Sequence, residues 1–295
     1  MINGVLIVDK PAGLTSHDVV DQVRRLTGIR RIGHTGTLDP MATGVLGILL
    51  GPATRLAQFA TAGEKQYWAI LRLGQTTDTY DADGRVVDEK RVDVDLEAIH
   101  SVLPRFRGAI AQLPPMVSAI RVNGKRLYKH ARQGEEIQRT PRPVTISKLA
   151  ILDWTSPDLT FEVSCSAGTY IRSLAHDIGQ TLGCGGHLRA LRRTASGPFR
   201  IEQSHSLDDL EQMRTQGRLL TALLPPAAAL GSMPGVVASA DQERAIRFGQ
   251  VVSPVTPFTS DLIQAHDANG DLIAVLRRVD DGTYRPVVVL PPSDD

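Results

Sequence analysis

The chain has 295 residues, enough for one large domain with its own hydrophobic core and a smaller second domain. It contains no run of roughly 18 to 20 apolar residues that could span a membrane, and residues 1–4 do not begin a signal peptide, so we expect a cytoplasmic protein. The net charge of +1 does not by itself indicate a nucleic-acid partner, and the two cysteines, Cys165 and Cys184, support neither a disulfide framework nor a cysteine zinc site and are expected to be buried.

Hydrophobic periodicity predicts strands and helices along the chain. Short apolar runs bounded by turn residues are typical of strands, and apolar residues three or four positions apart are typical of helices. In chain order, we expect a strand at 4–8, a helix capped by Ser16 and ended by Gly28, strands at 45–50 and 67–73, a helix from Asp95 to Phe106, strands at 144–153 and 159–164, and a helix at 170–182. This order favours an α/β (α+β) fold class, in which helices pack on a mixed sheet.

Basic residues are concentrated in two segments. Residues 121–148 contain eight Lys and Arg residues and two acidic residues. Residues 189–200 contain four arginines and no acidic residue. Either run alone is as typical of a solvated surface as of a binding site. Two such runs in a nearly neutral chain, however, indicate a polyanion bound along one face. The first run lies largely within residues 112–143, which contain few large apolar residues and are expected to form a mobile surface excursion.

The pattern changes again near the end of the chain. It breaks at residues 223–227, and the remainder holds a short predicted helix and three predicted strands, at 241–248, 263–266, 272–277 and 286–290. We therefore expect a large domain over residues 1–230 and a small β-rich domain over residues 231–295.

The segment that carries chemistry is residues 33–46, GHTGTLDPMATGVL. Its glycines allow a tight backbone, and Pro40 biases Asp39 toward an extended conformation, so Asp39 is presented on a stiff turn between core elements. An isolated Asp-Pro pair would be an ordinary turn. The segment does not have the spacing of a glycine-rich phosphate loop, and no HExxH occurs in the chain, so no metal site is predicted.

The extended segment GHTGTLDPMATGVLGILLG is very similar to the catalytic motif of the TruB family, the bacterial tRNA pseudouridine synthases that act on uridine 55. Further blocks of the chain resemble the same family in the same order, and together they cover most of residues 4–200. These blocks are residues 9–16, 65–67, 73–84, 112–115, 164–174 and 188–194. The resemblance implies an enzyme that isomerises uridine in the T loop of tRNA.

The resemblance also implies roles for individual residues. Asp39 corresponds to the essential aspartate of the family and Arg172 to its salt-bridge partner, because a bonded guanidinium favours an ionised carboxylate and aims its oxygens. Tyr67 corresponds to the active-site tyrosine that stacks on the target base, and His34 to the histidine that enters the T loop. Taken singly, Arg172 on a helix is more often a surface charge and Tyr67 a strand residue. The other expected substrate-binding residues are Lys10, Pro11, Thr37, Tyr170 and Leu191.

The implied reaction breaks the N1–C1′ glycosidic bond, rotates the uracil and rejoins it through C5. Nothing is oxidised or transferred from outside, so no cofactor is expected. The carboxylate could attack C1′, remove a sugar proton to give a glycal, or attack the base, and these routes stay open. Because a stacked base hides its glycosidic bond, the nucleotide has to leave the stack and enter a pocket.

The resemblance further implies a pseudouridine synthase catalytic domain over residues 1–230, an RNA-clamping insertion at about 112–143, and a PUA-like domain over 231–295. The implied partner is the T stem-loop of tRNA, with no obligate protein partner, and we expect a monomer. The family usually has an aromatic residue shortly after Pro114 and Pro115, whereas this chain has Met116 and Val117. That departure concerns local contacts.

Three other functions compete with this one. The guide-dependent branch of the same family has a related catalytic motif, although the clamp-like insertion favours an enzyme that recognises its own substrate. An RNA chaperone that folds tRNA by binding alone would not require Asp39, Tyr67 and Arg172 together. An unrelated hydrolase with an aspartate nucleophile has no second group of catalytic residues to support it.

Overall fold

The chain folds into two compact units. A computed structural model describes residues 2–118, 121–122, 125–127, 135, 137–254, 258–280 and 282–292. The first unit contains Met1–Asp39, Gly44–Gly63 and Ser196–Asp295, and the second contains Pro40–Thr43 and Glu64–Ala195. None of the helices in the described part of the chain is long and apolar enough to cross a membrane.

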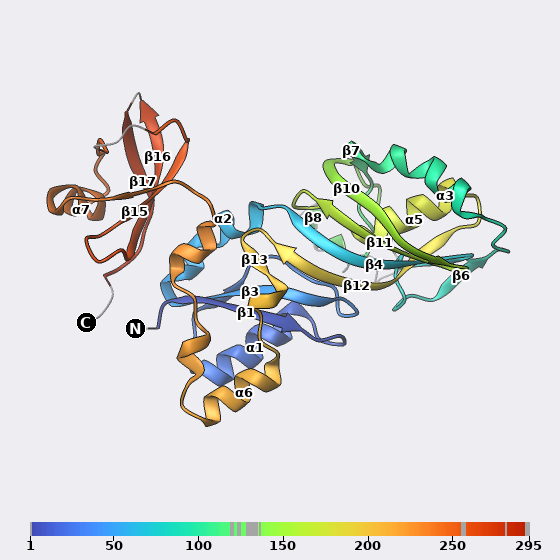
Figure 1. The fold of residues 1–295 in the computed structure, drawn as a ribbon, viewed down its shortest axis with the longest axis horizontal. Coiled ribbons are helices and arrows are strands. Elements are labelled where there is room, and N and C mark those ends of the chain that lie inside the picture. The colour runs from blue at the N-terminus through green and yellow to red at the C-terminus, as the bar shows by residue number, and fades with distance from the viewer. Residues whose placement is uncertain are drawn as a thin grey trace. The chain divides into compact units, whose positions relative to one another are not determined.

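The first unit is built on β1 (Gly4–Lys10), which pairs antiparallel with β3 (Thr43–Leu50), and on the short β2 (Ile32–His34), which pairs antiparallel with the end of β3. Successive residues of a strand point to opposite faces. Leu6 and Val8 lie in one core cluster with α1 (Ser16–Thr27) and α6 (Leu207–Thr215), which Figure 1 shows next to these strands. Val5 and Ile7 lie in a second cluster. Because both faces are covered, these strands are apolar without alternation.

The second cluster is formed with short helical segments and other irregular elements. They are η1 (Gly51–Leu56), α2 (Ala57–Ala62), β13 (Phe199–Arg200), η3 (Ile201–Gln203) and η5 (Pro226–Leu230), while η4 (Leu219–Ala222) belongs to the first cluster.

The helix α1 begins one residue earlier than expected. Thr15 accepts a hydrogen bond from the backbone of Asp18 at 3.1 Å, and the Asp18 carboxylate accepts one from the backbone of Thr15 at 2.8 Å. This reciprocal capping box makes Thr15 the N-cap, so the expectation that Ser16 caps the helix was wrong. Gly28 ends α1 with a φ of 72°, as expected.

A four-stranded sheet occupies the last part of the first unit. Its order is β14 (Gly235–Val237), β15 (Leu262–His266), β16 (Leu272–Asp280) and β17 (Thr283–Val289), with the first pair parallel and the others antiparallel. The helix α7 (Ala240–Arg247) packs on it through Ile246 in a core cluster of its own (Figure 1, orange to red). The predicted helix and three strands are confirmed, and the boundary at residue 230 stays a prediction.

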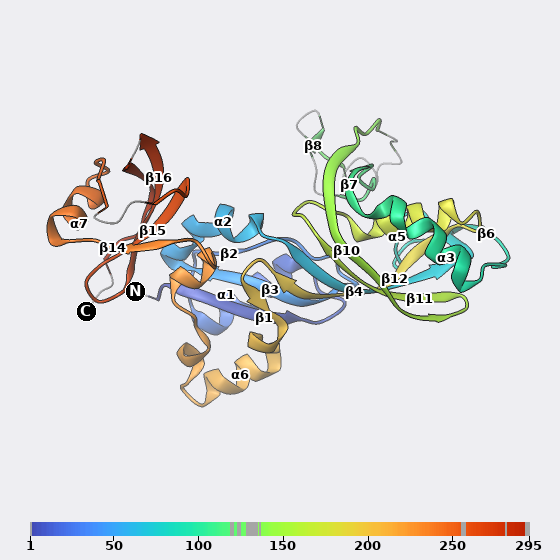
Figure 2. The same cartoon turned by 45° about the horizontal axis from the view of Figure 1, so that its top comes forward.

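The second unit contains a larger sheet with the order β12 (Gly186–Ser196), β4 (Lys65–Leu73), β11 (Asp158–Cys165), β10 (Arg142–Thr155) and β7 (Gly108–Gln112). The pairs β4–β11, β11–β10 and β10–β7 are antiparallel. Figures 1 and 2 show α5 (Ile171–Thr181) beside this sheet, next to α3 (Leu96–Val102) and η2 (Leu103–Phe106). The helix expected from Asp95 to Phe106 is therefore α-helical only as far as Val102.

Smaller elements complete the second unit. They are the antiparallel pair β5 (Gln75–Thr77) and β6 (Val86–Glu89), and the pair β8 (Arg121–Val122) and β9 (Lys125–Arg126) within the predicted insertion. The basic Lys129 and Arg132 and the acidic Glu136 lie outside the described residues, and the expected mobility of this segment stays a prediction. Cys165 and Cys184 are both buried and free, as expected.

Candidate active site

The loop that carries Asp39 is held against the start of α1. The buried Ser16 hydroxyl donates a hydrogen bond to the carbonyl of Leu38 at 3.1 Å and accepts one from its backbone N–H at 2.8 Å. Leu38 is itself buried, while Asp39 is half-buried and Pro40 is exposed. The loop therefore keeps Leu38 in the core and leaves the next residue, Asp39, half-buried.

A close backbone approach fixes the other side of this loop. The backbone N–H of Thr35 donates to the carbonyl of Gly47 at 2.9 Å. A Cβ atom at Gly47 would lie 2.6 Å from the Thr35 hydroxyl and 2.7 Å from the Phe199 ring. Glycine is therefore required at position 47 if the loop is to pack this closely on β3.

The other predicted site residues of the first unit lie on and around these strands. His34 ends β2, is half-buried, and accepts a hydrogen bond at Nδ1 from the backbone of Gly36 at 3.3 Å. Lys10 ends β1 opposite Gly44, is fully buried, and donates to the carbonyl of Pro11 at 2.8 Å. Pro11 and Thr37 are exposed.

In the second unit, Arg172 is buried at the start of α5, which excludes the alternative that it is a surface charge. Its Nη1 lies 3.2 Å from Oδ2 of Asp81, and it donates to the carbonyls of Thr79 at 3.1 Å and Val117 at 2.8 Å. The second oxygen of Asp81 accepts hydrogen bonds from the Thr79 hydroxyl at 2.5 Å and the backbone of Asp83 at 3.2 Å. The pairing of Arg172 with Asp39, which belongs to the other unit, stays a prediction.

Val117 lies in the short stretch after Pro114 and Pro115 in which the resemblance implies an aromatic residue. It meets Arg172 through its carbonyl oxygen, a group that every residue has. This contact therefore does not depend on the identity of the side chain.

A stacked ring pair stands beside the Arg172–Asp81 salt bridge. Tyr80 has a φ of 65°, a left-handed backbone that is uncommon outside glycine, and its ring stacks on His176 with centroids 3.8 Å apart. Burial lowers the pKa of His176, which favours the neutral imidazole. No local sequence pattern indicates this pair, because its members are 96 positions apart in the chain.

Tyr67, Tyr170 and Leu191 lie on three different elements of the second unit. Tyr67 is a buried residue of β4 opposite Val163 of β11, and Leu191 is a buried residue of β12. Tyr170 is the N-cap of α5, and the buried side-chain amide of Gln112 donates to its carbonyl at 2.9 Å and accepts from its N–H at 2.7 Å. The amide of Gln112 thus fixes the backbone of Tyr170.

Burial also shifts ionisable groups near these strands. Burial, followed by the charge of Arg193, lowers the pKa of Lys65 to about 8. Lys65 lies opposite Cys165, whose pKa burial raises to about 11, so this thiol stays protonated and is a poor nucleophile. Within the second basic run, Arg193 is fully buried, whereas Arg189 is exposed and pairs with Asp158.

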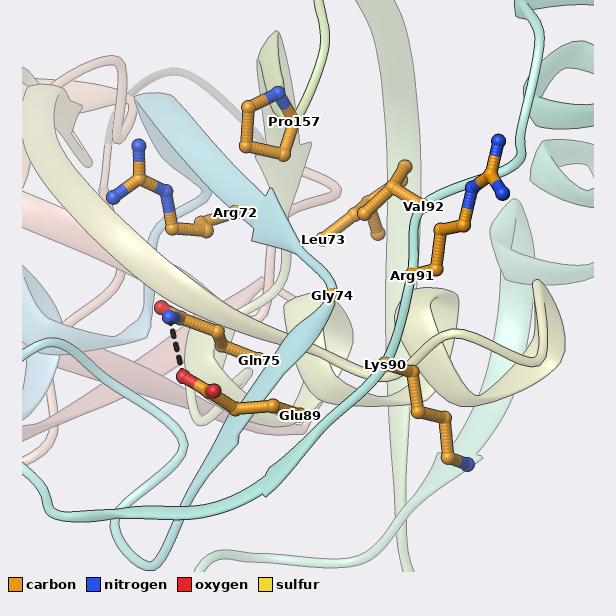
Figure 3. Close-up of a pocket in the computed structure, with 9 residues that line it drawn as sticks. All are labelled: Arg72, Leu73, Gly74, Gln75, Glu89, Lys90, Arg91, Val92 and Pro157. Atoms are coloured by element: carbon orange, nitrogen blue, oxygen red, sulfur yellow. Dashed lines mark hydrogen bonds between the residues drawn. The ribbon is translucent and has the colours of Figure 1, made fainter.

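A cavity of about 450 Å³ in the second unit contains none of the predicted site residues (Figure 3). Glu89 is the acidic residue that lines this cavity, and it accepts a hydrogen bond from the side-chain amide of Gln75 at 2.9 Å. The side chains of Lys90 and Arg91 point in different directions. It therefore assembles no catalytic pair. Among the described residues, no three His, Cys, Asp or Glu side chains gather to hold a metal ion.

Family models match two consecutive stretches of the chain. Residues 24–171 match the N-terminal domain of the TruB family of pseudouridylate synthases, and residues 172–230 match the C-terminal domain of tRNA pseudouridylate synthase B. The tRNA pseudouridine synthase B of Solibacter usitatus is 42% identical over 294 residues, which cover 98% of this chain and 100% of the relative. That of Dechloromonas aromatica is 47% identical over 252 residues, which cover 85% and 84%.

Solved structures of more distant relatives have a similar fold. The crystal structure of a Cbf5–Nop10–Gar1 complex contains a chain with 29% identity and a TM-score of 0.76, and the match covers 98% of this chain and 84% of that one. The structure of an H/ACA RNP bound to a substrate RNA containing 2′-deoxyuridine gives 27% identity and a TM-score of 0.75 over 98% and 85% of the two chains. The expected pseudouridine synthase fold is thereby confirmed.

Proposed function

Because the chain belongs to the TruB family of pseudouridylate synthases, we propose that it isomerises uridine 55 in the T loop of tRNA to pseudouridine. The observation that carries the proposal is the Asp39 loop, whose backbone is fixed to α1 by Ser16 while Asp39 itself is only half-buried. A carboxylate on a rigid loop suits a reaction in which one group acts repeatedly at the same sugar.

In the proposed reaction, Asp39 promotes cleavage of the N1–C1′ bond, either by attacking C1′ or by removing a sugar proton. The released uracil rotates and C5 bonds to C1′. The hydrogen at C5 then leaves as a proton while N1 gains one, so atoms and electrons balance without a cofactor. Tyr67 stacks on the extruded base and His34 enters the T loop, as the resemblance implies.

Two further parts are proposed to hold the RNA. The insertion at residues 112–143 clamps the T stem-loop through its phosphates, which is supported by its excess of basic residues. Residues 231–295 form a PUA-like module, which is supported by a four-stranded sheet with a core cluster of its own. The enzyme acts as a monomer in the cytoplasm, with tRNA as its partner.

The guide-dependent function is the alternative that the H/ACA RNP structure favours. The relatives named tRNA pseudouridine synthase B are 42% and 47% identical to this chain, compared with 27% for the H/ACA RNP chain, which favours the enzyme that works without a guide.

The test uses the purified chain and an unmodified tRNA transcript, with no other protein or RNA. Pseudouridine is mapped by carbodiimide modification and primer extension, with a transcript carrying cytidine at position 55 as the control. We expect one reverse-transcription stop next to position 55 that is absent from the control. Absence of the stop from both transcripts would rule out the proposal, and a stop that requires an added guide RNA would establish the alternative.

A further inference from the structure

Ser16 bonds to both backbone polar groups of the residue before Asp39. Its hydroxyl donates to the Leu38 carbonyl at 3.1 Å and accepts from the Leu38 N–H at 2.8 Å, across 22 positions of sequence. Ser16 is 2% exposed and Leu38 is 4% exposed, so water has little access to replace these bonds. One side chain thus fixes the backbone from which Asp39 projects.

The start of α1 leaves Ser16 available for this contact. The first N–H groups of a helix have no partner within it and are commonly satisfied by an N-cap side chain. In this chain Thr15 is the cap, in a reciprocal pair with Asp18. The hydroxyl of Ser16, the first helical residue, is therefore free of capping and bonds to the Asp39 loop instead.

The two residues on either side of Asp39 act together. Pro40 biases the backbone of Asp39 toward an extended conformation, and Leu38 is fixed by Ser16 and by its own burial. We propose that Ser16 is a positioning residue for Asp39, and that its two hydrogen bonds hold the carboxylate at the reacting sugar. The proposal rests on the proposed function, in which Asp39 carries the chemistry.

The test is Ser16→Ala, which removes the hydroxyl and leaves the helix cap intact. A misplacement of a catalytic group by about 1 Å can cost on the order of 100-fold in rate. We therefore expect the single-turnover rate constant for pseudouridine formation to fall by about 10- to 100-fold. The dissociation constant for tRNA should stay within about twofold of the wild-type value, because Ser16 is only 2% exposed and offers little surface to a ligand.

Thr27→Val is the matched control on the same helix. The Thr27 hydroxyl also donates to one backbone carbonyl, that of Val23 at 2.8 Å, and accepts from one N–H, that of Ile29 at 3.3 Å. It lies at the opposite end of α1. The control should lower the melting temperature by a similar amount and leave the rate constant unchanged, which separates positioning from a general loss of stability.

Ser16→Cys provides a graded second variant, because a thiol is similar in size and forms weaker hydrogen bonds. Its rate should lie between those of the wild type and Ser16→Ala, and it serves in place of the alanine variant if that one does not fold. Equal rates in the wild type and the variant, or an equal loss in Thr27→Val, would overturn the proposal. If the wild type and all variants are inactive on tRNA that they bind, the proposed function itself fails and this inference fails with it.

Discussion

Nη1 of Arg172 lies 3.2 Å from Oδ2 of Asp81, in a salt bridge whose side chains are only 4% and 6% exposed. A charge buried to this degree is costly unless it is paired and hydrogen-bonded, and both partners meet that condition. Arg172 also bonds to Val117, in the predicted insertion. The residue expected to pair with Asp39 is thus already held in a fixed orientation within its own unit.

Asp81→Asn should destabilise the protein strongly, because it removes the negative charge of a buried salt bridge and leaves the rest of the Arg172 site unchanged. We expect the free energy of unfolding to fall by about 3 kcal/mol. Asp78→Asn is the control, since Asp78 pairs with the exposed Arg85, and it should change stability by about 0 to 1 kcal/mol. Urea denaturation measures the free energy of unfolding of both variants. Equal losses in the two variants would show that the buried salt bridge stabilises the protein no more than the exposed one does.

Gln112→Leu should loosen the start of α5. The variant removes the side-chain acceptor of the Tyr170 N–H, at a cost of about 1 to 3 kcal/mol if that group stays buried, whereas the Tyr170 carbonyl keeps its bond from the backbone N–H of Leu174. The affinity for tRNA should fall as well if Tyr170 lines the pocket. Gln75→Leu removes an amide that bonds to the exposed Glu89, and it serves as the comparison in denaturation and binding assays. A binding loss confined to Gln75→Leu would contradict the expectation.

Asp177 should make stability depend on pH. Burial raises the pKa of its carboxyl to about 6, above the ordinary value of 3.8, so the folded state binds the proton more tightly than the unfolded state does. Its contribution to stability is therefore largest below pH 3.8 and is lost as the pH rises through about 6. Asp177→Asn should therefore raise the free energy of unfolding by about 1 kcal/mol at pH 7.5, after allowance for the partial exposure of the carboxyl group.

Thermal melting of the wild type and Asp177→Asn at pH 4.5 and 7.5 measures this difference. The gain should shrink at the lower pH. A gain that is the same at both pH values would point to a cause other than ionisation.

Salt dependence tests the proposed clamp. Arg142 is exposed at the start of β10, near the end of the predicted insertion, and a phosphate contact there adds about one unit to the slope of log K against log salt concentration. Arg142→Ala should reduce the slope for tRNA binding by about one unit. Lys148 on the same strand is paired with Glu162 at 2.5 Å, so Lys148→Ala should leave the slope nearly unchanged. Equal slopes in all three proteins would exclude Arg142 from the interface.

Periodicity in the sequence predicted most elements of the fold because their buried faces are continuous. The strand β1 and the helix α1 both have clear apolar patterns and were located within one or two residues. The strand β12 is not predicted by the sequence pattern, because Arg189, Arg192 and Arg193 form a run of charged residues there. In the structure, half-buried and buried residues alternate from residue 190 to residue 195, and Arg193 is one of the buried ones.

The site was predictable only where the resemblance named a residue. Asp81 is one of three aspartates between positions 78 and 83, and no local pattern separates it from the others, because its partner Arg172 lies 91 positions away. Thr15 and Ser16 are both competent N-caps, so the sequence alone could not assign one to the helix and the other to Leu38. Such choices depend on tertiary contacts, which a local pattern does not contain.

The most direct test of the account is tritium release from tRNA transcript labelled with [5-³H]uridine, because C5 loses its hydrogen when the new glycosidic bond forms. The wild type should release one equivalent at the T-loop uridine, as should Asp18→Asn, which alters an exposed carboxylate of the α1 cap. Asp39→Asn should bind the transcript and release none. Tritium release by Asp39→Asn at the wild-type rate would contradict the account, because the isomerisation would then proceed without the Asp39 carboxylate.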